Sequence, residues 1–183
     1  NESMGKLFGT DGIRGIVGEN LTADLAFRVG QAVGTVLMEE KGGQRPTVVL
    51  GKDTRISSDM LEAALIAGLC SVGSDVKPVG DIPTPAVAYL TRQEQADAGI
   101  VVSASHNPYE HNGIKVFNSQ GYKLPDALEE RVEEKILSGE PMAMRTRGEL
   151  GRRHHGMKQL KRDYIDFAAS TIDSDLAGLR ILV

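Results

Sequence analysis

Short apolar runs alternate with segments of helical periodicity along most of this chain, and that alternation limits the fold more than any other feature. Residues 47–51 and 99–102 are apolar stretches of strand length, and such runs are typical of buried strands. Residues 25–37 and 58–69 repeat apolar side chains at helical spacing. Strands that alternate with helices predict an α/β domain with a mixed, largely parallel sheet layered between helices.

Capping and breaking residues set the expected ends of several elements. Thr22 and Ser58 stand at positions where their hydroxyls can cap the two helices. Gly42 and Gly43 are expected to end the first helix. Pro78 lies within a weaker strand pattern, and it favours an edge position because proline has no N–H to donate to a neighbouring strand.

The stretch after this strand predicts a third helix, a turn, a hairpin and a fourth helix. Residues 83–92 begin with two prolines and read as a helix. Residues 112–113 are Asn-Gly, a strong turn signal. They are followed by a hairpin pattern over 114–124 and a charged helix over 125–137. Four glutamates of that helix are expected on its solvent-exposed face: Glu129, Glu130, Glu133 and Glu134.

The two ends of the sequence suggest a domain that continues into a second one. Residues 1–3 precede a methionine and are expected to be a remnant of cloning. Residues 4–140 form the expected first domain, and 141–157 lack periodicity and are expected to be a linker. Residues 158–183 read as the truncated start of a second, similar domain, with a helix and then an apolar strand. We expect either disorder after about residue 157 or exchange of this segment between molecules, because its strand edge is unpaired.

Composition excludes several classes of protein. The formal net charge of the 183 residues is −4, which argues against a nucleic-acid partner. Cys70 is the single cysteine, so neither an intramolecular disulfide nor a multi-cysteine metal site can form. No apolar run approaches the ~18 residues of a membrane span, and no signal peptide is visible. We therefore expect a cytoplasmic protein without a membrane partner.

The candidate site is the polar segment 103–108, Ser-Ala-Ser-His-Asn-Pro, which follows the most apolar run. In open α/β sheets, ligands bind at the carboxyl ends of strands. Ser105, beside His106, is therefore a candidate nucleophile or phosphate carrier, and Lys115 could neutralise a transferring phosphoryl group or move a proton. Most serines in such loops only cap or turn the chain. A Ser-His-Asp hydrolase is the rival chemistry, but the Gly-x-Ser-x-Gly pattern is missing around this serine.

Two other polar segments are weaker candidates. Glycines surround Arg14 in 9–15, so backbone amides and a guanidinium could converge on an anion, with an ordinary turn as the equal alternative. In 52–55, Lys-Asp-Thr-Arg, the favoured interpretation is an Asp–Arg pair that braces its own loop. The histidines at His111 and at 154–155 are expected to be solvated.

Four motifs occur in order at 8–15, 51–55, 103–108 and 112–115. Together they resemble the α-D-phosphohexomutase family, and the first and third look most like its bacterial phosphoglucosamine mutase branch. The resemblance covers essentially all of 4–183, which would be the first domain and the start of the second. A phosphomannomutase or phosphoglucomutase of the same family remains an alternative. So does a non-catalytic module for dimerisation or partner binding.

The resemblance implies that Ser105 is a phosphoserine in an isomerase. The serine would give its phosphoryl group to a hexosamine 6-phosphate, forming a 1,6-bisphosphate, and would then take back the other phosphate and leave the 1-phosphate. This reaction would serve the synthesis of amino-sugar nucleotides for the cell wall. Mg²⁺ would bind through the phosphate of Ser105, with its other ligands absent here, because the family's Asp-Gly-Asp-x-Asp-Arg loop does not occur in this sequence.

The resemblance also assigns roles to neighbouring residues. Ser105, Arg14 and Lys115 would be catalytic, and His106 would position the serine. The phosphate- or substrate-binding residues would be Arg14, Gly15, Asn107 and Lys115. A homodimer through this first domain is implied as well. Without the metal loop and the downstream sugar-binding segments, we expect the 183-residue chain alone to have no mutase activity.

Overall fold

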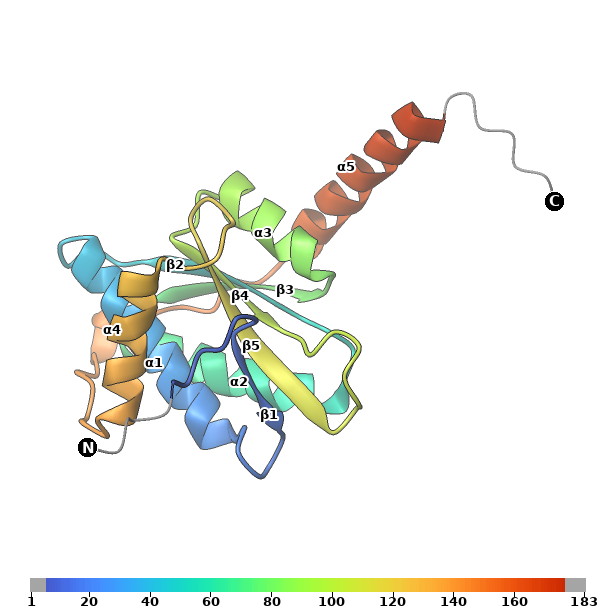
Figure 1. Ribbon diagram of the computed structural model, residues 1–183. Helices are drawn as coiled ribbons and strands as arrows, with labels where there is room; N and C mark the ends of the chain where they lie inside the picture. Colours follow the sequence, from blue (N-terminus) through green and yellow to red (C-terminus); the bar gives the residue numbers. More distant parts are fainter. Residues whose placement is uncertain (1–5, 177–183) are drawn as a thin grey trace.

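A computed structural model describes residues 6–176 and contains one five-stranded sheet in the order β1-β5-β4-β2-β3 (Figure 1). The strands are β1 Ile13–Ile16, β2 Thr47–Lys52, β3 Asp75–Asp81, β4 Ala98–Val102 and β5 His111–Asn118. β2 pairs in parallel with β3 and β4, whereas β5 is antiparallel to β4 and to β1. The expected mixed, largely parallel sheet is confirmed, and Pro78 lies on the edge strand as predicted.

Helices cover both faces of the sheet. They are α1 Ala23–Glu40, α2 Ile56–Ser71, α3 Thr84–Gln93, α4 Asp126–Leu137 and α5 Lys158–Leu176, with a 3-10 turn at Arg147–Glu149. α1 and α2 pack on one face with α4 outside α1, and α3 lies on the other face (Figure 1). The alternation of side chains splits the core between these layers, because Ile100 faces α1 and α2 while Val101 faces α3. No helix within residues 6–176 is long and apolar enough to cross a membrane.

The two expected helix caps differ in outcome. Thr22 caps α1, with its Oγ1 accepting a hydrogen bond from Leu25 N–H at 3.1 Å, as predicted. Ser58 does not cap α2, which begins two residues earlier at Ile56. Its buried hydroxyl donates instead to the carboxylate of Asp53. The expected cap was wrong because the helix starts earlier, which places Ser58 inside the first turn, where its hydroxyl bonds to a carboxylate five residues before it.

The region around β5 also departs from expectation. Asn112 and Gly113 lie inside β5, so the predicted turn there is wrong. The buried Asn112 side chain is compatible with a strand because its own hydrogen bonds are satisfied. The expected hairpin is reduced to a tight return, in which a single bridge joins Phe117 to Lys123.

The α4 glutamates are only partly a solvent-exposed face. Glu129 is buried, and the carboxylate of Glu133 accepts a hydrogen bond from the backbone N–H of Phe8. The expectation of four solvated carboxylates was therefore wrong for these two residues. The physical reason is that the N-terminal segment packs against α4, a contact that helical periodicity does not encode.

The expected linker contains a segment that lies along the sheet rather than free of it. We call residues 145–154 the edge strap. The backbone N–H of Val76 in β3 donates to Arg152 O at 2.9 Å, and His154 N–H donates back to Val76 O at 2.8 Å. Arg145 N–H and Gly151 N–H donate to carbonyls at the end of α2. The strap covers the outer edge of β3, and such covering protects an otherwise unpaired strand.

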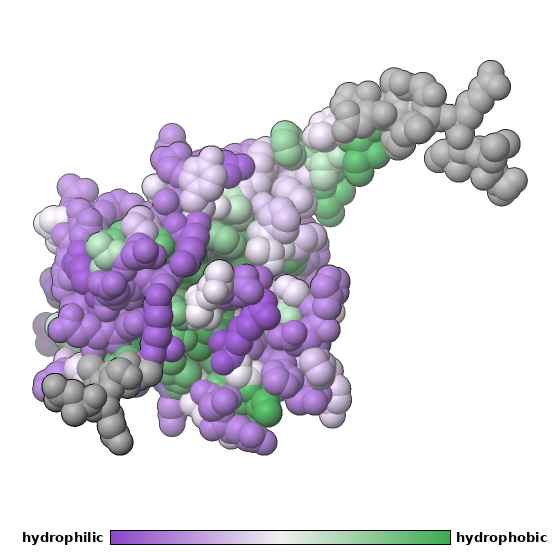
Figure 2. All heavy atoms as spheres, in the orientation of Figure 1, coloured by the Kyte–Doolittle hydropathy of each residue, from purple (hydrophilic) through white to green (hydrophobic). Residues whose placement is uncertain are grey.

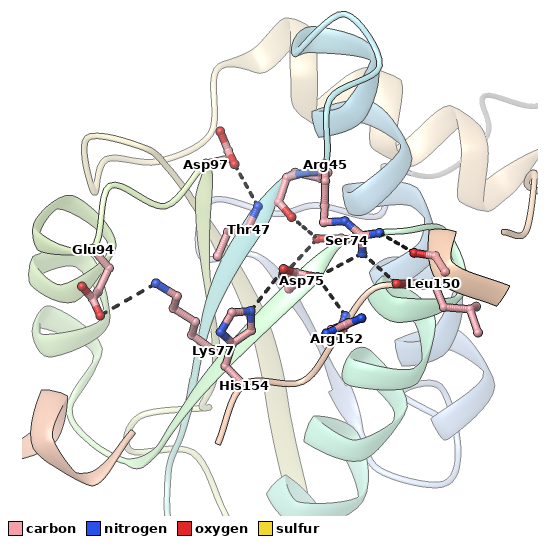
Figure 3. Close-up of polar contacts among 12 residues, drawn as sticks. Arg45, Thr47, Ser74, Asp75, Lys77, Glu94, Asp97, Leu150, Arg152 and His154 are labelled. Atoms are coloured by element: carbon pink, nitrogen blue, oxygen red, sulfur yellow. Dashed lines mark hydrogen bonds and ion pairs between the residues drawn. The ribbon is translucent and has the colours of Figure 1, made fainter. Parts of the chain in front are cut away.

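One carboxylate fastens the edge strap (Figure 3). Asp75 lies within hydrogen-bond distance of three groups: Arg45 Nη1 at 3.1 Å, Arg152 N–H at 2.9 Å and His154 Nε2 at 3.1 Å. Burial alone would raise the pKa of Asp75, but these hydrogen bonds outweigh it and lower the pKa. The expectation that His154 is only solvated was therefore wrong, because its ring pairs with a carboxylate more than seventy residues earlier.

α5 leaves the body of the domain (Figure 1) after packing its first turns on α3. The ring of Tyr89 lies 5.8 Å from that of Tyr164 and 4.5 Å from that of Phe167. Figure 2 shows hydrophobic side chains along α5, where Ile165 and Ile172 are each 53% exposed. The helix expected in this region is present, and the disorder expected after residue 157 is not seen in 158–176. Exchange between molecules stays a prediction, and the apolar strand at 179–183 lies outside the described residues.

Asp75→Asn should weaken the attachment of the edge strap. Because the folded pKa of Asp75 lies below the unfolded value, ionised Asp75 stabilises the fold above about pH 4 and loses that effect as the pH falls through the folded pKa. We expect urea unfolding at pH 7 to show a loss of about 1–3 kcal/mol, and the difference from the unaltered chain to shrink toward pH 3. Asp166→Asn, at an exposed position, is the control; a pH-independent loss in Asp75→Asn would contradict the argument.

Two glycines allow α1 and α2 to approach closely. A Cβ at Gly30 would lie 2.6 Å from Leu65 O, and one at Gly68 would lie 2.1 Å from Phe27 O. Both obstacles are backbone atoms, so neither can be relieved by rotating a side chain.

Gly68→Ala should therefore destabilise the domain although alanine is the better helix former by about 1 kcal/mol. We expect a net loss of about 1–3 kcal/mol from overpacking, measured by urea or thermal unfolding. Gly148→Ala, where nothing lies within 4 Å of the added Cβ, should be close to neutral. Equal effects of the two changes would refute the close-approach argument.

Candidate active site

Ser105 is presented on a short loop directly after β4. Ser103 N–H donates to Gly113 O at 2.9 Å, which ties the start of the loop to β5. Ser105 N–H then donates to Ser103 Oγ at 3.2 Å. Ser105 is exposed and has a left-handed backbone, φ 56°. This conformation costs a non-glycine residue of order 1 kcal/mol or more, so surrounding contacts must hold it.

Arg55 supplies such contacts from the loop after β2. Its Nη2 donates to Asn107 O at 2.6 Å and to Ser105 O at 3.2 Å. Its Nη1 pairs with Asp53, as the sequence predicted for this motif. The sequence analysis did not foresee that the same guanidinium also reaches the serine loop. The only sequence signal for this role was that both motifs belong to the ordered set at 51–55 and 103–108.

The Asp53 carboxylate is held ionised by its neighbours. Ser58 Oγ and Arg55 N–H donate to Oδ1, while the Arg55 guanidinium donates to Oδ2. Burial would raise the pKa of Asp53, but the hydrogen bonds from Ser58 and Arg55 lower it below its ordinary value. The Asp53 carboxylate therefore remains charged at neutral pH.

Arg14 and Lys115 lie on the same face of the sheet. Arg14 in β1 lies opposite Gly113 in β5, and Lys115 follows two residues later, so the two side chains share a face. A Cβ added at Gly113 would lie 3.3 Å from Arg14 Cγ and 2.9 Å from Ser103 O. The arginine side chain thus crosses β5 next to the base of the serine loop. It pairs with Asp11 at 3.7 Å.

Within residues 6–176, no hydrogen bond or ion pair joins Ser105 directly to Arg14 or Lys115. Lys115 instead lines a cavity of about 210 Å³ together with Thr10, Asp11 and Gly12. Thr84, at the first turn of α3, faces the same cavity. Its ammonium groups, hydroxyls and glycine-rich turn are groups that can bind an anion, and the same lining also carries the carboxylates of Asp11 and Glu129.

His106 and Asn107 follow the serine in its loop, whereas Gly15 lies in β1 opposite Asn112 of β5. His106 is exposed at the turn of the loop, and Asn107 is held through its backbone. Packing explains the glycine at position 15, because a Cβ there would lie 2.3 Å from Asn20 Oδ1. That oxygen accepts a hydrogen bond from Ile16 N–H. Binding of phosphate by Gly15 or Asn107 stays a prediction.

Gly12→Ala should disturb this site through the backbone of β5. Gly12 has φ 88°, and a Cβ there would lie 2.3 Å from Ile114 O. Gly18, with φ 87° and nothing within 4 Å, carries the same conformational cost without the collision. We expect Gly12→Ala to lower the free energy of unfolding by about 1–3 kcal/mol more than Gly18→Ala. Equal losses would show that backbone conformation alone accounts for the glycine.

Comparison with known proteins agrees with the motifs. A family model described as phosphoglucomutase/phosphomannomutase, alpha/beta/alpha domain I, matches residues 5–142. The phosphoglucosamine mutase of Caldanaerobacter subterraneus subsp. tengcongensis is 58% identical over 180 residues, covering 98% of this chain and 40% of the relative. That of Syntrophomonas wolfei is 52% identical over 182 residues with the same coverage. The chain thus spans about 40% of the length of these relatives.

The fold has solved counterparts as well. A phosphoglucomutase/phosphomannomutase family protein from Burkholderia thailandensis superposes with a TM-score of 0.67 at 29% identity, covering 81% of this chain and 32% of that structure. The family model, the relatives and the solved structure all belong to the family that the four motifs resemble. This chain belongs to the phosphoglucomutase/phosphomannomutase family, the α-D-phosphohexomutases.

Proposed function

We propose that this chain is the phosphoryl-carrying domain of a phosphoglucosamine mutase. The observation that supports it most directly is the exposed, left-handed Ser105 at the carboxyl end of β4, held by Arg55. It occurs in a chain 58% identical to a phosphoglucosamine mutase. Glucosamine 6-phosphate and glucosamine 1-phosphate are the proposed substrates, and the reaction supplies precursors of amino-sugar nucleotides.

The proposed chemistry is a phosphoryl transfer that leaves the enzyme unchanged after two steps. In the first, the bond between Ser105 Oγ and phosphorus breaks while the 1-hydroxyl oxygen of the sugar phosphate bonds to phosphorus and loses its proton. In the second, the reoriented bisphosphate returns its 6-phosphoryl group to Ser105 Oγ, and the sugar oxygen regains a proton. His106 is the nearest histidine in the sequence, and its proposed role is to position the serine.

The charges near Ser105 suit this cycle. A phosphoserine carries about −1.5 to −2 charges at neutral pH and is stabilised by cations. Arg14 and Lys115 occupy the strands beside the serine loop and present their cations on one face of the sheet. We propose that these two side chains bind phosphate groups. In support, Arg14 packs over Gly113, whose carbonyl accepts a hydrogen bond from the first residue of the serine loop, and Lys115 lies two residues further along β5.

Mg²⁺ is the proposed metal, with oxygen atoms of phosphorylated Ser105 among its ligands. The exposed hydroxyl fits this role, because a phosphate there would be open to solvent and to a metal. Residues 6–176 contain no cluster of three or more side chains suited to a metal. The family resemblance assigns the carboxylate ligands to a downstream segment. When bound, the ion would neutralise charge on the transferring group.

The remaining expectations are proposals about the whole protein. We propose a cytoplasmic homodimer that contacts its partner through this domain, where Ile56 and Tyr109 are 94% and 85% exposed. A phosphomannomutase or phosphoglucomutase activity is the alternative within the family. The named relatives favour glucosamine phosphates over those sugars, since each is a phosphoglucosamine mutase.

Ser105→Ala in the full-length protein should abolish the interconversion of glucosamine 6-phosphate and 1-phosphate. The activity should fall by at least about 10³-fold, since no carrier of the phosphoryl group remains. A coupled assay with glucosamine, glucose and mannose phosphates measures activity and sugar preference together. Intact-mass and peptide analysis should locate phosphate on Ser105 in the active enzyme.

Ser119→Ala, which changes an exposed serine on the turn after β5, is the matched control and should keep normal activity. The 183-residue chain alone should show no turnover. Normal activity of Ser105→Ala would refute the phosphoserine role. Preference for glucose or mannose phosphates would replace the proposed substrate with the alternative.

A further inference from the structure

We propose that Arg55 is the residue that positions the phosphoserine loop, acting through a partly buried polar network and not by contact with substrate. This inference rests on the proposed function of Ser105. It assigns to the motif at 51–55 a part in the reaction beyond bracing its own loop.

The contacts of Arg55 fix both sides of the loop turn. A single nitrogen, Nη2, donates to the carbonyl oxygens of Ser105 and Asn107, which flank His106 in the sequence. Asn107 N–H in turn donates to Ala104 O at 3.1 Å, which closes the turn. Two carbonyls held by one planar donor group restrict the backbone dihedrals between them. This restraint offsets the cost of the left-handed conformation of Ser105.

Asp53 in turn fixes the guanidinium. Its two carboxylate oxygens accept from Arg55 at both the backbone and the side chain, and from Ser58 Oγ. The Arg55 and Asp53 side chains are only 16% and 23% exposed, so water competes weakly for these bonds. These bonds to Asp53 therefore fix the orientation of the Arg55 guanidinium, unlike that of a solvated surface arginine.

The network continues to the strand that carries Lys115. Asn112 Nδ2 donates to Ser58 Oγ at 2.9 Å and to Ser57 Oγ at 3.0 Å. Its Oδ1 accepts from Gly113 N–H at 2.8 Å, and Gly113 O accepts from Ser103 N–H. The hydrogen bonds thus run from the loop after β2, through the start of α2 and β5, back to the serine loop. The network links the serine loop to the strand whose Lys115 would bind phosphate.

Positioning of this kind predicts a specific kinetic effect. A displacement of a reacting group by about 1 Å can slow a reaction about 10²-fold. Among residues 6–176, the hydrogen bonds of the Arg55 side chain go to two backbone carbonyls of the loop and to the carboxylate of Asp53. Its loss should therefore lower kcat while KM changes little. A residue that serves only the stability of the domain would leave kcat per folded molecule unchanged.

The chain offers a closely matched control in Arg45. Its guanidinium also pairs with an aspartate, Asp75, and donates to two backbone carbonyls, those of Leu150 and Gly148. Those carbonyls belong to the edge strap rather than to the serine loop. Arg45→Gln should therefore remove a similar set of hydrogen bonds without affecting the position of Ser105.

The test compares Arg55→Gln, Arg55→Lys and Arg45→Gln in the full-length protein. We expect Arg55→Gln to lower kcat about 10²-fold with KM within about threefold, and to keep phosphate on Ser105 by intact mass. Arg55→Lys should recover part of kcat, because an ammonium can donate to one carbonyl but cannot reproduce the planar fork. Arg45→Gln should keep the kcat of the unaltered enzyme.

Amide hydrogen exchange of the 183-residue chain gives a readout without activity. The amides of Ser105 and Asn107 should exchange about tenfold faster in Arg55→Gln and at the original rate in Arg45→Gln, since local opening of the loop sets their exchange. If full-length Arg55→Gln does not fold, Arg55→Lys replaces it in the kinetic comparison. The exchange measurement on the 183-residue chain still tests the inference in that case.

Two results would overturn the inference. One is an Arg55→Gln enzyme with kcat within about threefold of the original, or with unchanged loop exchange. The other is an equal loss of kcat in Arg45→Gln, which would assign the effect to stability. Failure of the proposed function looks different: the unaltered enzyme would then lack mutase activity, or its phosphate would lie on a residue other than Ser105.

Discussion

The position of the candidate site depends on β4, which is hydrogen-bonded along both edges and buried on both faces. All five of its residues are buried. β2 pairs with it on one side and β5 on the other. A strand with no free edge and no solvated face cannot slip in register without exposing apolar side chains. The loop that follows it therefore begins at a fixed point, from which Ser105 is presented to solvent.

The parts of the fold that the sequence predicted are those governed by local chemistry or by burial of a continuous pattern. The apolar run at 99–102 identified β4, and helical periodicity identified α1 and α2. Thr22 capped α1 as expected because its partner lies three residues away. Pro78 lay at the sheet edge because its missing N–H excludes it from most central positions.

Except for the cap of α2, the parts that it did not predict depend on partners far apart in the chain. Asn112 is a turn former by local preference, yet side chains from α2 satisfy it within a strand. His154 is polar and flanked by polar residues, and only the fold places it beside Asp75. The candidate site shows the same division. Ser105 could be selected from its position after a strand, whereas the reach of Arg55 to the serine loop required the pairing of β2 with β4.

The edge strap has a mechanical consequence for whatever follows α5. Its last hydrogen bond to the sheet is at His154, and α5 begins at Lys158. Only residues 155–157 separate the strap from the helix, and Gly156 among them has φ 78°. The chain is attached again directly afterwards, because Met157, Leu160 and Tyr164 pack on the α3 side of the core. Two attachments, one on each side of this short connection, therefore set the direction in which α5 leaves the domain, and the packing on α3 would still hold the helix if the strap were weakened.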